Sequence, residues 1–143
     1  MVSIQDKINK LKKDFEALDG WESRYRLIIE IGHNLTPLLE TEMVDENLVK
    51  GCMSKVWLVA NVIDGKVIFK GDSDASITKG LVAILVGVYS NETPDDIINT
   101  KPDFLDDLGI KDALSMNRAS GLTSMLKQIR LYALAFKVKM GQA

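Results

Sequence analysis

Cysteine and histidine are almost absent from this sequence of 143 residues, which contains one of each. A single cysteine cannot form an internal disulfide, so a scaffold held by disulfides is excluded. Structural zinc usually takes four cysteine or histidine ligands, so Cys52 and His33 do not make such a site. The acidic pairs of the chain lack the spacing and the loop glycine of a calcium-binding loop. We therefore predict a protein without a metal site.

Long apolar runs and an excess of basic charge are also missing. The longest apolar run, residues 80–89, is about half as long as the ~20 residues that a membrane span requires. The net charge is −2, unlike the basic footprint of a nucleic-acid-binding protein. The charged, amphipathic start of the chain lacks the apolar core of a signal peptide. We expect a soluble, cytoplasmic protein that binds neither nucleic acid nor membranes.

Nucleotide-binding and hydrolase motifs are absent as well. The sequence contains no G-x-x-x-x-G-K-[ST] phosphate loop and no G-x-S-x-G nucleophile elbow. Gly51 and Gly71 do not form a dinucleotide fingerprint. We therefore predict no cofactor bound to this chain.

The remaining composition is that of a globular protein. Apolar residues make up 46% of the chain and charged residues 27%, and the length suits one ordinary domain. The sequence shows no internal repeat, low-complexity segment or linker. We predict a single domain over residues 1–143.

Two amphipathic helices are predicted at the start of the chain. Apolar residues recur at steps of three and four across residues 3–18, and Gly20 suits the end of this helix. A second helix opens at Trp21 and is broken before Pro37. Residues 40–50 are predicted to form a polar connection with one helical turn.

A β-hairpin is predicted next. Residues 56–63 alternate in period two with β-branched side chains, Asp64-Gly65 is a strong hairpin-turn signal, and residues 66–70 form the return strand. A third strand is possible near residues 48–50. Strands clustered between helices predict an α+β fold, with a small antiparallel sheet of about three strands packed against several helices. Both faces of the first strand are fairly apolar, so we expect helices on one face and a shield on the other.

The second half of the chain carries several helix-start signals. Ser73 or Asp74 can cap the next helix, whose apolar content predicts the most buried helix of the fold. Thr93, followed by proline, begins a short helix. Ser115 or Asn117 can cap the last helix, which carries an apolar stripe.

Cys52 is the main candidate for chemistry. Gly51 permits a sharp turn just before the strand, and Lys50 and Lys55 could favour the reactive thiolate. The alternative is that Cys52 is a small buried hydrophobe, because cysteine is among the most buried residue types.

Two further residues are candidates beside it. His33 could act as the base of a Cys–His pair in a small hydrolase or transferase, although nothing in the sequence brings the two together. Arg118, taken alone, is a solvated arginine or a partner for a carboxylate. A third hypothesis is a non-catalytic adaptor in which Cys52 only packs.

Three blocks of sequence resemble the SufE family of sulfur-acceptor proteins, which includes the CsdE branch. Residues 51–57 (GCMSKVW) are similar to its Gly-Cys-x-Ser-x-Val-Trp motif. Residues 71–81 (GDSDASITKGL) and 114–122 (LSMNRASGL) are similar to two later blocks, in the same order and spacing. The departures from the family pattern are at Met53, Lys55, Met116 and Asn117.

The resemblance implies a two-layer fold like that of SufE and IscU, and a role in sulfur relay. Cys52 would accept persulfide sulfur from a SufS/CsdA-type cysteine desulfurase, an enzyme that uses pyridoxal phosphate, and stimulate that enzyme. The sulfur would pass to a SufBCD-type iron–sulfur scaffold. Asp74 and Arg118 would lie near the partner surface, and the acceptor loop beside an apolar cavity. The matched acceptor-loop residues are Gly51, Ser54, Lys55 and Trp57.

The chemistry of sulfur transfer agrees with this implication. Transfer is an attack by a thiolate on a sulfur atom, as in thiol–disulfide exchange. It requires one thiol on a loop that can reach another protein's site, and no cofactor on the acceptor. A second nearby cysteine would divert the persulfide into a disulfide. We expect the loop of Cys52 to be tucked in when the protein is free.

Overall fold

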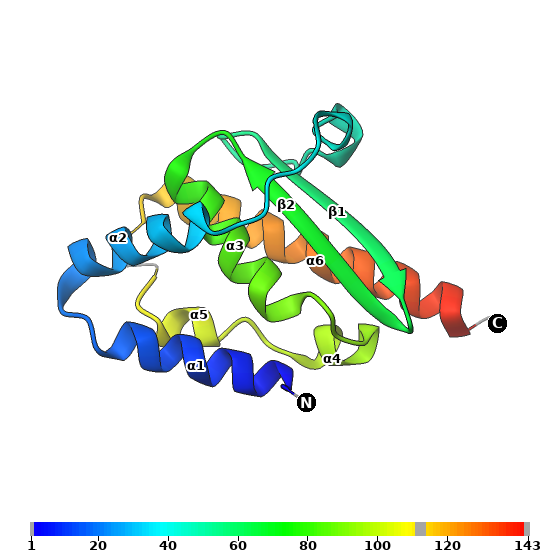
Figure 1. The fold of residues 1–143 in the computed structure, drawn as a ribbon, viewed down its shortest axis with the longest axis horizontal. Coiled ribbons are helices and arrows are strands. Elements are labelled where there is room, and N and C mark those ends of the chain that lie inside the picture. The colour runs from blue at the N-terminus through cyan, green and yellow to red at the C-terminus, as the bar shows by residue number, and fades with distance from the viewer. Residues whose placement is uncertain (1, 111–113, 142–143) are drawn as a thin grey trace.

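The computed structural model describes residues 2–110 and 114–141 (Figure 1). Within these residues the chain forms six α-helices, two 3₁₀ turns and two strands. The elements are α1 (Ile4–Glu16), α2 (Gly20–His33), η1 (Glu40–Glu42), η2 (Asp45–Asn47), β1 (Val56–Ile63), β2 (Lys66–Ser73), α3 (Ser76–Tyr89), α4 (Pro94–Asn99), α5 (Phe104–Asp107) and α6 (Met116–Gly141). An antiparallel sheet packed against helices confirms the predicted α+β class.

The hairpin forms where the alternating pattern predicts it. β1 pairs with β2 in antiparallel register, from Val56 opposite Ser73 to Ile63 opposite Lys66. The turn residues Asp64 and Gly65 both have positive φ, as a tight two-residue hairpin turn requires. The return strand is three residues longer than predicted, because it keeps pairing as far as Ser73.

The predicted third strand is wrong. Leu48 makes one isolated bridge to Trp57, and the N–H of Val49 donates to the carbonyl of Val56 at 2.8 Å. Gly51 then takes a φ of +90°, which turns the chain away before a ladder can form. Within the described residues the sheet therefore has two strands.

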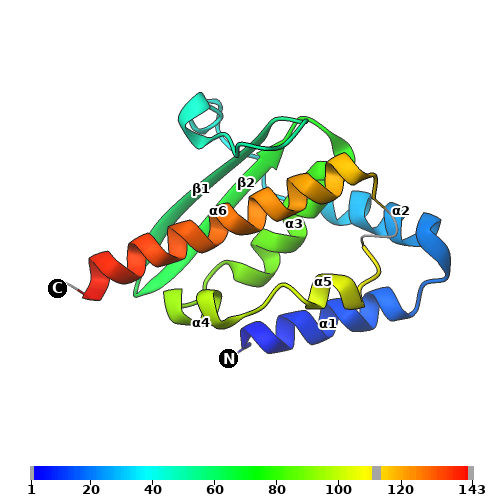
Figure 2. The ribbon, with the colours of Figure 1, turned by 180° about the vertical axis from the view of Figure 1, so that it is seen from behind.

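One part of the core lies between the hairpin and the helices α3 and α6, and the same buried cluster continues to α1, α2, α4 and α5. α3 and α6 both cover the inner face of the hairpin, and Figure 2 shows α6 running along its length. The inner-face residues Val56 and Leu58 are buried, and α3 is the most buried helix, as its composition predicted. The opposing residues from these helices are Val82, Leu85, Met125 and Ile129.

The outer face of the hairpin is covered at one end only. Asp72 is buried there, where its carboxylate accepts from the N–H of Leu38, and Glu42 pairs with Lys70 at 3.6 Å. At the far end Ile63 is 58% exposed. The shield expected on this face is therefore partial.

α2 packs directly onto the backbone of α3. A Cβ placed on Gly32 would lie 2.7 Å from the backbone nitrogen of Gly80, so the two helices approach at a pair of glycines. A Cβ on Gly80 would in turn meet the carbonyl of Ile28. This close approach fixes the position of α3 relative to α2. It therefore also fixes the position of the first residues of α3, which begins at Ser76.

Helix starts partly follow the predicted caps. The Thr93 hydroxyl accepts from the N–H of Asp96, and the Ser115 hydroxyl accepts from the N–H of Arg118 at 3.4 Å. The predicted cap of α3 is wrong, because Ala75 occupies that position and makes no side-chain cap bond.

Gly20 also differs from its predicted role. α1 ends at Glu16, and Gly20 begins α2 with a φ of +75° instead of ending the first helix.

The charges of the chain are unevenly distributed over the fold. α6 contains no acidic residue and five basic ones. Thirteen bases and all twenty acidic residues lie elsewhere in the sequence, which gives the rest of the chain a formal charge of −7. The basic residues of α6 are Arg118, Lys127, Arg130, Lys137 and Lys139.

Candidate functional site

Cys52 lies on the loop between η2 and β1 and rests against α6. Its Sγ donates to the carbonyl of Gly121 at 3.6 Å, and the side chain is half-buried. The positive φ of Gly51 brings the loop so close to α6 that a Cβ there would lie 2.5 Å from the Ser124 hydroxyl. Glycine is therefore required immediately before the thiol. The loop is tucked onto the body of the protein, as expected.

Three hydrogen bonds fasten the end of this loop to the end of β2. The carboxylate of Asp74 accepts from the N–H of Lys55 at 3.0 Å. The N–H of Asp74 and the hydroxyl of Ser73 donate to the carbonyl of Lys55 at 3.2 and 2.8 Å. The two side chains that were predicted to cap α3 therefore bind the loop of Cys52 instead.

A cavity of about 340 Å³ opens beside the thiol. It lies between the Cys52 loop and the first turns of α3 and α6. Both polar and apolar side chains line it, and apolar atoms make up the larger part of its surface. The lining residues are Cys52, Met53, Ser54, Thr78, Ser115, Asn117, Arg118, Gly121 and Met125.

Burial governs the protonation of the thiol. Loss of solvent around Cys52 raises the pKa of its thiol above the usual value. The hydrogen bond to Gly121 also favours the protonated form, because only a thiol can donate to a carbonyl. The hypothesis that Lys50 and Lys55 favour the thiolate is therefore wrong for the tucked loop, where both lysines are exposed.

Arg118 lies at the cavity and contacts α2. Its Nη1 donates to the hydroxyl of Tyr25 at 3.4 Å, and the Tyr25 ring packs edge-on against Trp21. Trp21 is 57% exposed. Arg118 thus joins the cavity to an exposed aromatic side chain that was not among the predicted site residues.

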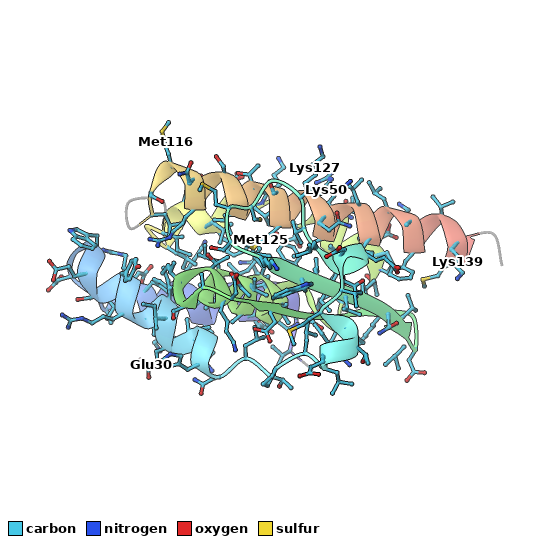
Figure 3. The ribbon with its side chains drawn as sticks, turned by 90° about the horizontal axis from the view of Figure 1, so that it is seen from above. Glu30, Lys50, Met116, Met125, Lys127 and Lys139 are labelled. Carbon is cyan, nitrogen blue, oxygen red and sulfur yellow. The ribbon has the colours of Figure 1, made fainter. Side chains whose placement is uncertain are left out.

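Two exposed methionines accompany the cavity: Met53 lines it, and Met116 directly precedes the lining residue Asn117 at the start of α6. Met53 is 80% exposed and Met116 is 87% exposed. Figure 3 shows Met116 pointing away from the body at the start of α6, whereas Met125 points inward. Both exposed methionines are positions where the chain departs from the family pattern.

The predicted site residues divide into three groups. Cys52, Ser54 and Arg118 line the cavity. Gly51, Lys55 and Asp74 shape and fasten the loop. Trp57 lies on the other side of β1, half-buried, and is not one of the described residues that line the cavity.

His33 is not part of this arrangement. It is exposed at the end of α2 and is not one of the described residues that line the cavity of Cys52. A nucleophile and its base must lie within hydrogen-bond reach, and the described structure pairs Cys52 with Gly121. The geometry gives the Cys–His hypothesis no support.

Sequence reasoning missed Thr78, Tyr25 and Gly121. Thr78 lies among Ser76 and Lys79 in the polar first turn of α3, so no contrast in the sequence marks it. Only the fold brings it to Cys52.

Metal clusters and membrane-spanning helices are both missing from the described residues. No group of three or more histidine, cysteine, aspartate or glutamate side chains among them could hold a metal ion. In the same part of the chain, no helix has both the length and the apolar character of a membrane span.

Comparison with known proteins identifies the family. The SufE family, described as an Fe-S metabolism associated domain, matches residues 9–133. An uncharacterized SufE-like protein of Rhizobium meliloti is 41% identical over 130 residues, covering 86% of this chain and 91% of that protein. One from Synechocystis is 33% identical over 136 residues, covering 95% and 86%.

A solved structure supports the same fold. The solution structure of a hypothetical protein from Thermus thermophilus superimposes with a TM-score of 0.76, covering 94% of this chain and 97% of that one. At 21% identity this likeness shows the fold alone. Taken with the sequence matches over most of its length, the chain belongs to the SufE family, whose domain is associated with iron–sulfur metabolism.

Proposed function

We propose that this protein is a sulfur carrier that accepts persulfide sulfur from a cysteine desulfurase onto Cys52 and passes it to an iron–sulfur scaffold. The observation that carries the proposal is the position of the only thiol, on a glycine-shaped loop at the edge of a cavity. A carrier needs one thiol that can be both sheltered and presented to another protein. Membership of the SufE family supports the same role.

The proposed transfer is balanced without an oxidant. The thiolate of Cys52 attacks the outer sulfur of the persulfide on the desulfurase. A new S–S bond forms to Cys52 as the S–S bond on the desulfurase breaks, and that enzyme's cysteine leaves as a thiolate. The desulfurase, which uses pyridoxal phosphate, provides the earlier chemistry, and removal of its persulfide would stimulate its turnover.

The tucked position of Cys52 does not suit this attack. Its raised pKa and its hydrogen bond to Gly121 keep the thiol protonated, and only the thiolate is nucleophilic. We therefore infer that the loop moves outward when the desulfurase docks. Gly51 provides the flexible point, and the bonds between Lys55 and Asp74 hold the other end.

The surface around the cavity supports docking of the desulfurase there. Exposed apolar side chains gathered on one surface are typical of protein contact sites, and methionine adapts readily to a partner. Arg118 and Asp74 provide charged groups beside them. The exposed apolar residues are Trp21, Met53 and Met116.

Intact-protein mass spectrometry tests the proposal. We would incubate the protein with a SufS/CsdA-type desulfurase and cysteine, without reductant, and compare the wild type with Cys52→Ser. We expect a gain of one or more sulfur atoms, mapped to Cys52 and absent from the variant. His33→Gln is the matched control and should gain the same mass. Equal sulfur on Cys52→Ser would refute the carrier role, and loss of transfer in His33→Gln would favour the enzymatic alternative.

A further inference from the structure

The second half of α6 exposes a row of large apolar side chains. Leu131, Leu134 and Val138 are between 40% and 59% exposed. They follow one another at steps of four or three residues, so they lie along one side of the helix. The opposite side of α6 is already buried in the core, through Ile129 and Ala133. A surface helix normally turns polar residues to water, so a second apolar row indicates contact with another molecule.

This row has the pattern of a coiled-coil seam with a basic flank. In a heptad, Leu131 and Val138 take the a position and Leu134 takes the d position between them. The g positions beside them are Arg130 and Lys137, which are both basic and exposed. We call these five residues the α6 seam. Figure 2 shows α6 crossing the front of the molecule, on the side away from α1 and α2.

The charges of the seam decide what can cover it. In a parallel pair of two copies, the bases at g would face the e positions, which are the uncharged Gln128 and Ala135. In an antiparallel pair the same bases would face each other and repel. Neither arrangement gives complementary charge, so a second copy of this chain does not suit the seam. A helix with carboxylates along its flank does.

We propose that the α6 seam is a docking site for an acidic amphipathic helix of a partner protein. Leucine-type side chains of that helix would pack on the apolar row, and its carboxylates would pair with Arg130 and Lys137. α6 contains no acidic residue that would repel them. Lys137 already pairs with Asp95 at 2.7 Å, but both side chains are more than half exposed. Such a surface pair contributes little, so Lys137 can exchange one carboxylate for another.

The seam is separate from the site of the thiol. Cys52 contacts α6 at Gly121, and Leu134 is 13 residues further along the helix (134 minus 121). At a rise of about 1.5 Å per residue, the seam is centred about 20 Å from that contact. A helix docked there leaves the Cys52 loop free, so one partner can be held while another reaches the thiol. The inference goes beyond the proposed function and does not depend on it.

A synthetic peptide provides the probe. It would contain three heptads with leucine at a and d and glutamate at e and g, and a fluorophore whose anisotropy reports binding to the full chain. We expect saturable binding to the wild type in dilute buffer, weakened by added salt because charge pairing contributes. The matched peptide with lysine at e and g should not bind.

Three variants locate the binding. Leu134→Ser should weaken binding of the acidic peptide about tenfold, because it removes an apolar side chain that the docked helix would bury. Arg130→Glu should weaken the acidic peptide and strengthen the lysine peptide. Leu39→Ser is the matched control, since Leu39 is 67% exposed next to η1, and it should bind as the wild type does. Unchanged melting temperatures would show that each variant folds, and Lys137→Glu replaces Arg130→Glu if the latter melts earlier.

Several results would overturn the inference. Equal affinity of the wild type and Leu134→Ser would do so, as would equal affinity for the two peptides, or no binding up to about 1 mM peptide. A dimer of the protein that Leu134→Ser dissociates in analytical ultracentrifugation would assign the seam to a second copy. Cosedimentation with phosphatidylglycerol vesicles, lost in Leu134→Ser and without peptide binding, would assign it to a membrane surface instead.

Discussion

The protonation of Cys52 links one residue to the stability of the fold. Burial raises the pKa of its thiol in the folded protein relative to the unfolded chain. Above the ordinary thiol pKa of about 8.5, the unfolded chain has lost a proton that the folded protein still holds. The contribution is therefore fully present below that pH and is lost as the pH rises through the folded pKa.

We predict that the wild type loses more thermal stability between about pH 7.5 and pH 9.5 than Cys52→Ser does, because serine does not titrate in this range. Thermal denaturation at a series of pH values measures the difference. The two curves of melting temperature against pH should diverge only at the alkaline end. Parallel curves would show that the loop does not bury the thiol in solution.

The role of a single residue could be predicted from the sequence only where the residue belongs to a local sequence motif. Gly51 and Cys52 stand together in a motif, and the structure shows why the glycine is needed. Thr78 is 26 positions further along the chain, in the first turn of α3. Its position beside Cys52 depends on how α3 packs, which no local pattern encodes.

At the scale of elements, the Cys52 loop is held by three hydrogen bonds that join Lys55 to Ser73 and Asp74. We predict that Asp74→Ala opens the loop more often, because it removes the carboxylate that accepts from the N–H of Lys55 at 3.0 Å. A hydrogen bond of this kind contributes about 0.5–1.5 kcal/mol, so iodoacetamide should alkylate Cys52 about two- to tenfold faster. The kinetics of alkylation, followed by mass, provide the measurement.

Asp95→Ala is the matched control for this prediction. Asp95 is also an exposed aspartate, but it pairs with Lys137 on α6, away from the loop. Its removal should leave alkylation at the wild-type rate. Identical rates for the wild type and Asp74→Ala would mean that the bonds at residues 73 and 55 hold the loop without the Asp74 carboxylate.

The element boundaries show where the predictions from sequence patterns differ from the structure. Periodicity predicted the hairpin and the long helices, because each buries one regular face. The predicted third strand was wrong because Gly51 turns the chain after a single bridge. The predicted caps at Ser73 and Asp74 were wrong because both side chains bind Lys55, a partner 18 or 19 positions away. Side chains suited to capping can thus be engaged by tertiary contacts.

For the whole molecule, the contact between α2 and α3 is the tightest packing constraint. We predict that Gly80→Ala destabilises the protein by about 1–3 kcal/mol, because its Cβ would press into the carbonyl of Ile28 and force the helices apart. Chemical denaturation measures the free energy of unfolding. If residues 1–143 form one domain, as the sequence predicts, the loss should appear in a single transition.

Gly87→Ala is the matched control in the same helix. A Cβ on Gly87 would meet no atom within 4 Å, so alanine there should stabilise α3 by about 0.5–1 kcal/mol through its helix propensity. If Gly80→Ala lowers the free energy of unfolding and Gly87→Ala raises it, the effect of close packing is distinguished from the effect of helix propensity. A neutral Gly80→Ala would contradict the contact between the two helix backbones.

The separation of charge between α6 and the rest of the chain produces an electric field that extends further than any direct contact. A helix with five bases and no acids, set against a remainder of −7, gives the molecule an electric dipole. In the field of a charged partner the protein rotates before it touches, which selects the face that arrives first. Since the screening length is about 8 Å at physiological salt, this orientation is an encounter effect, strongest in dilute buffer and weakened by added salt.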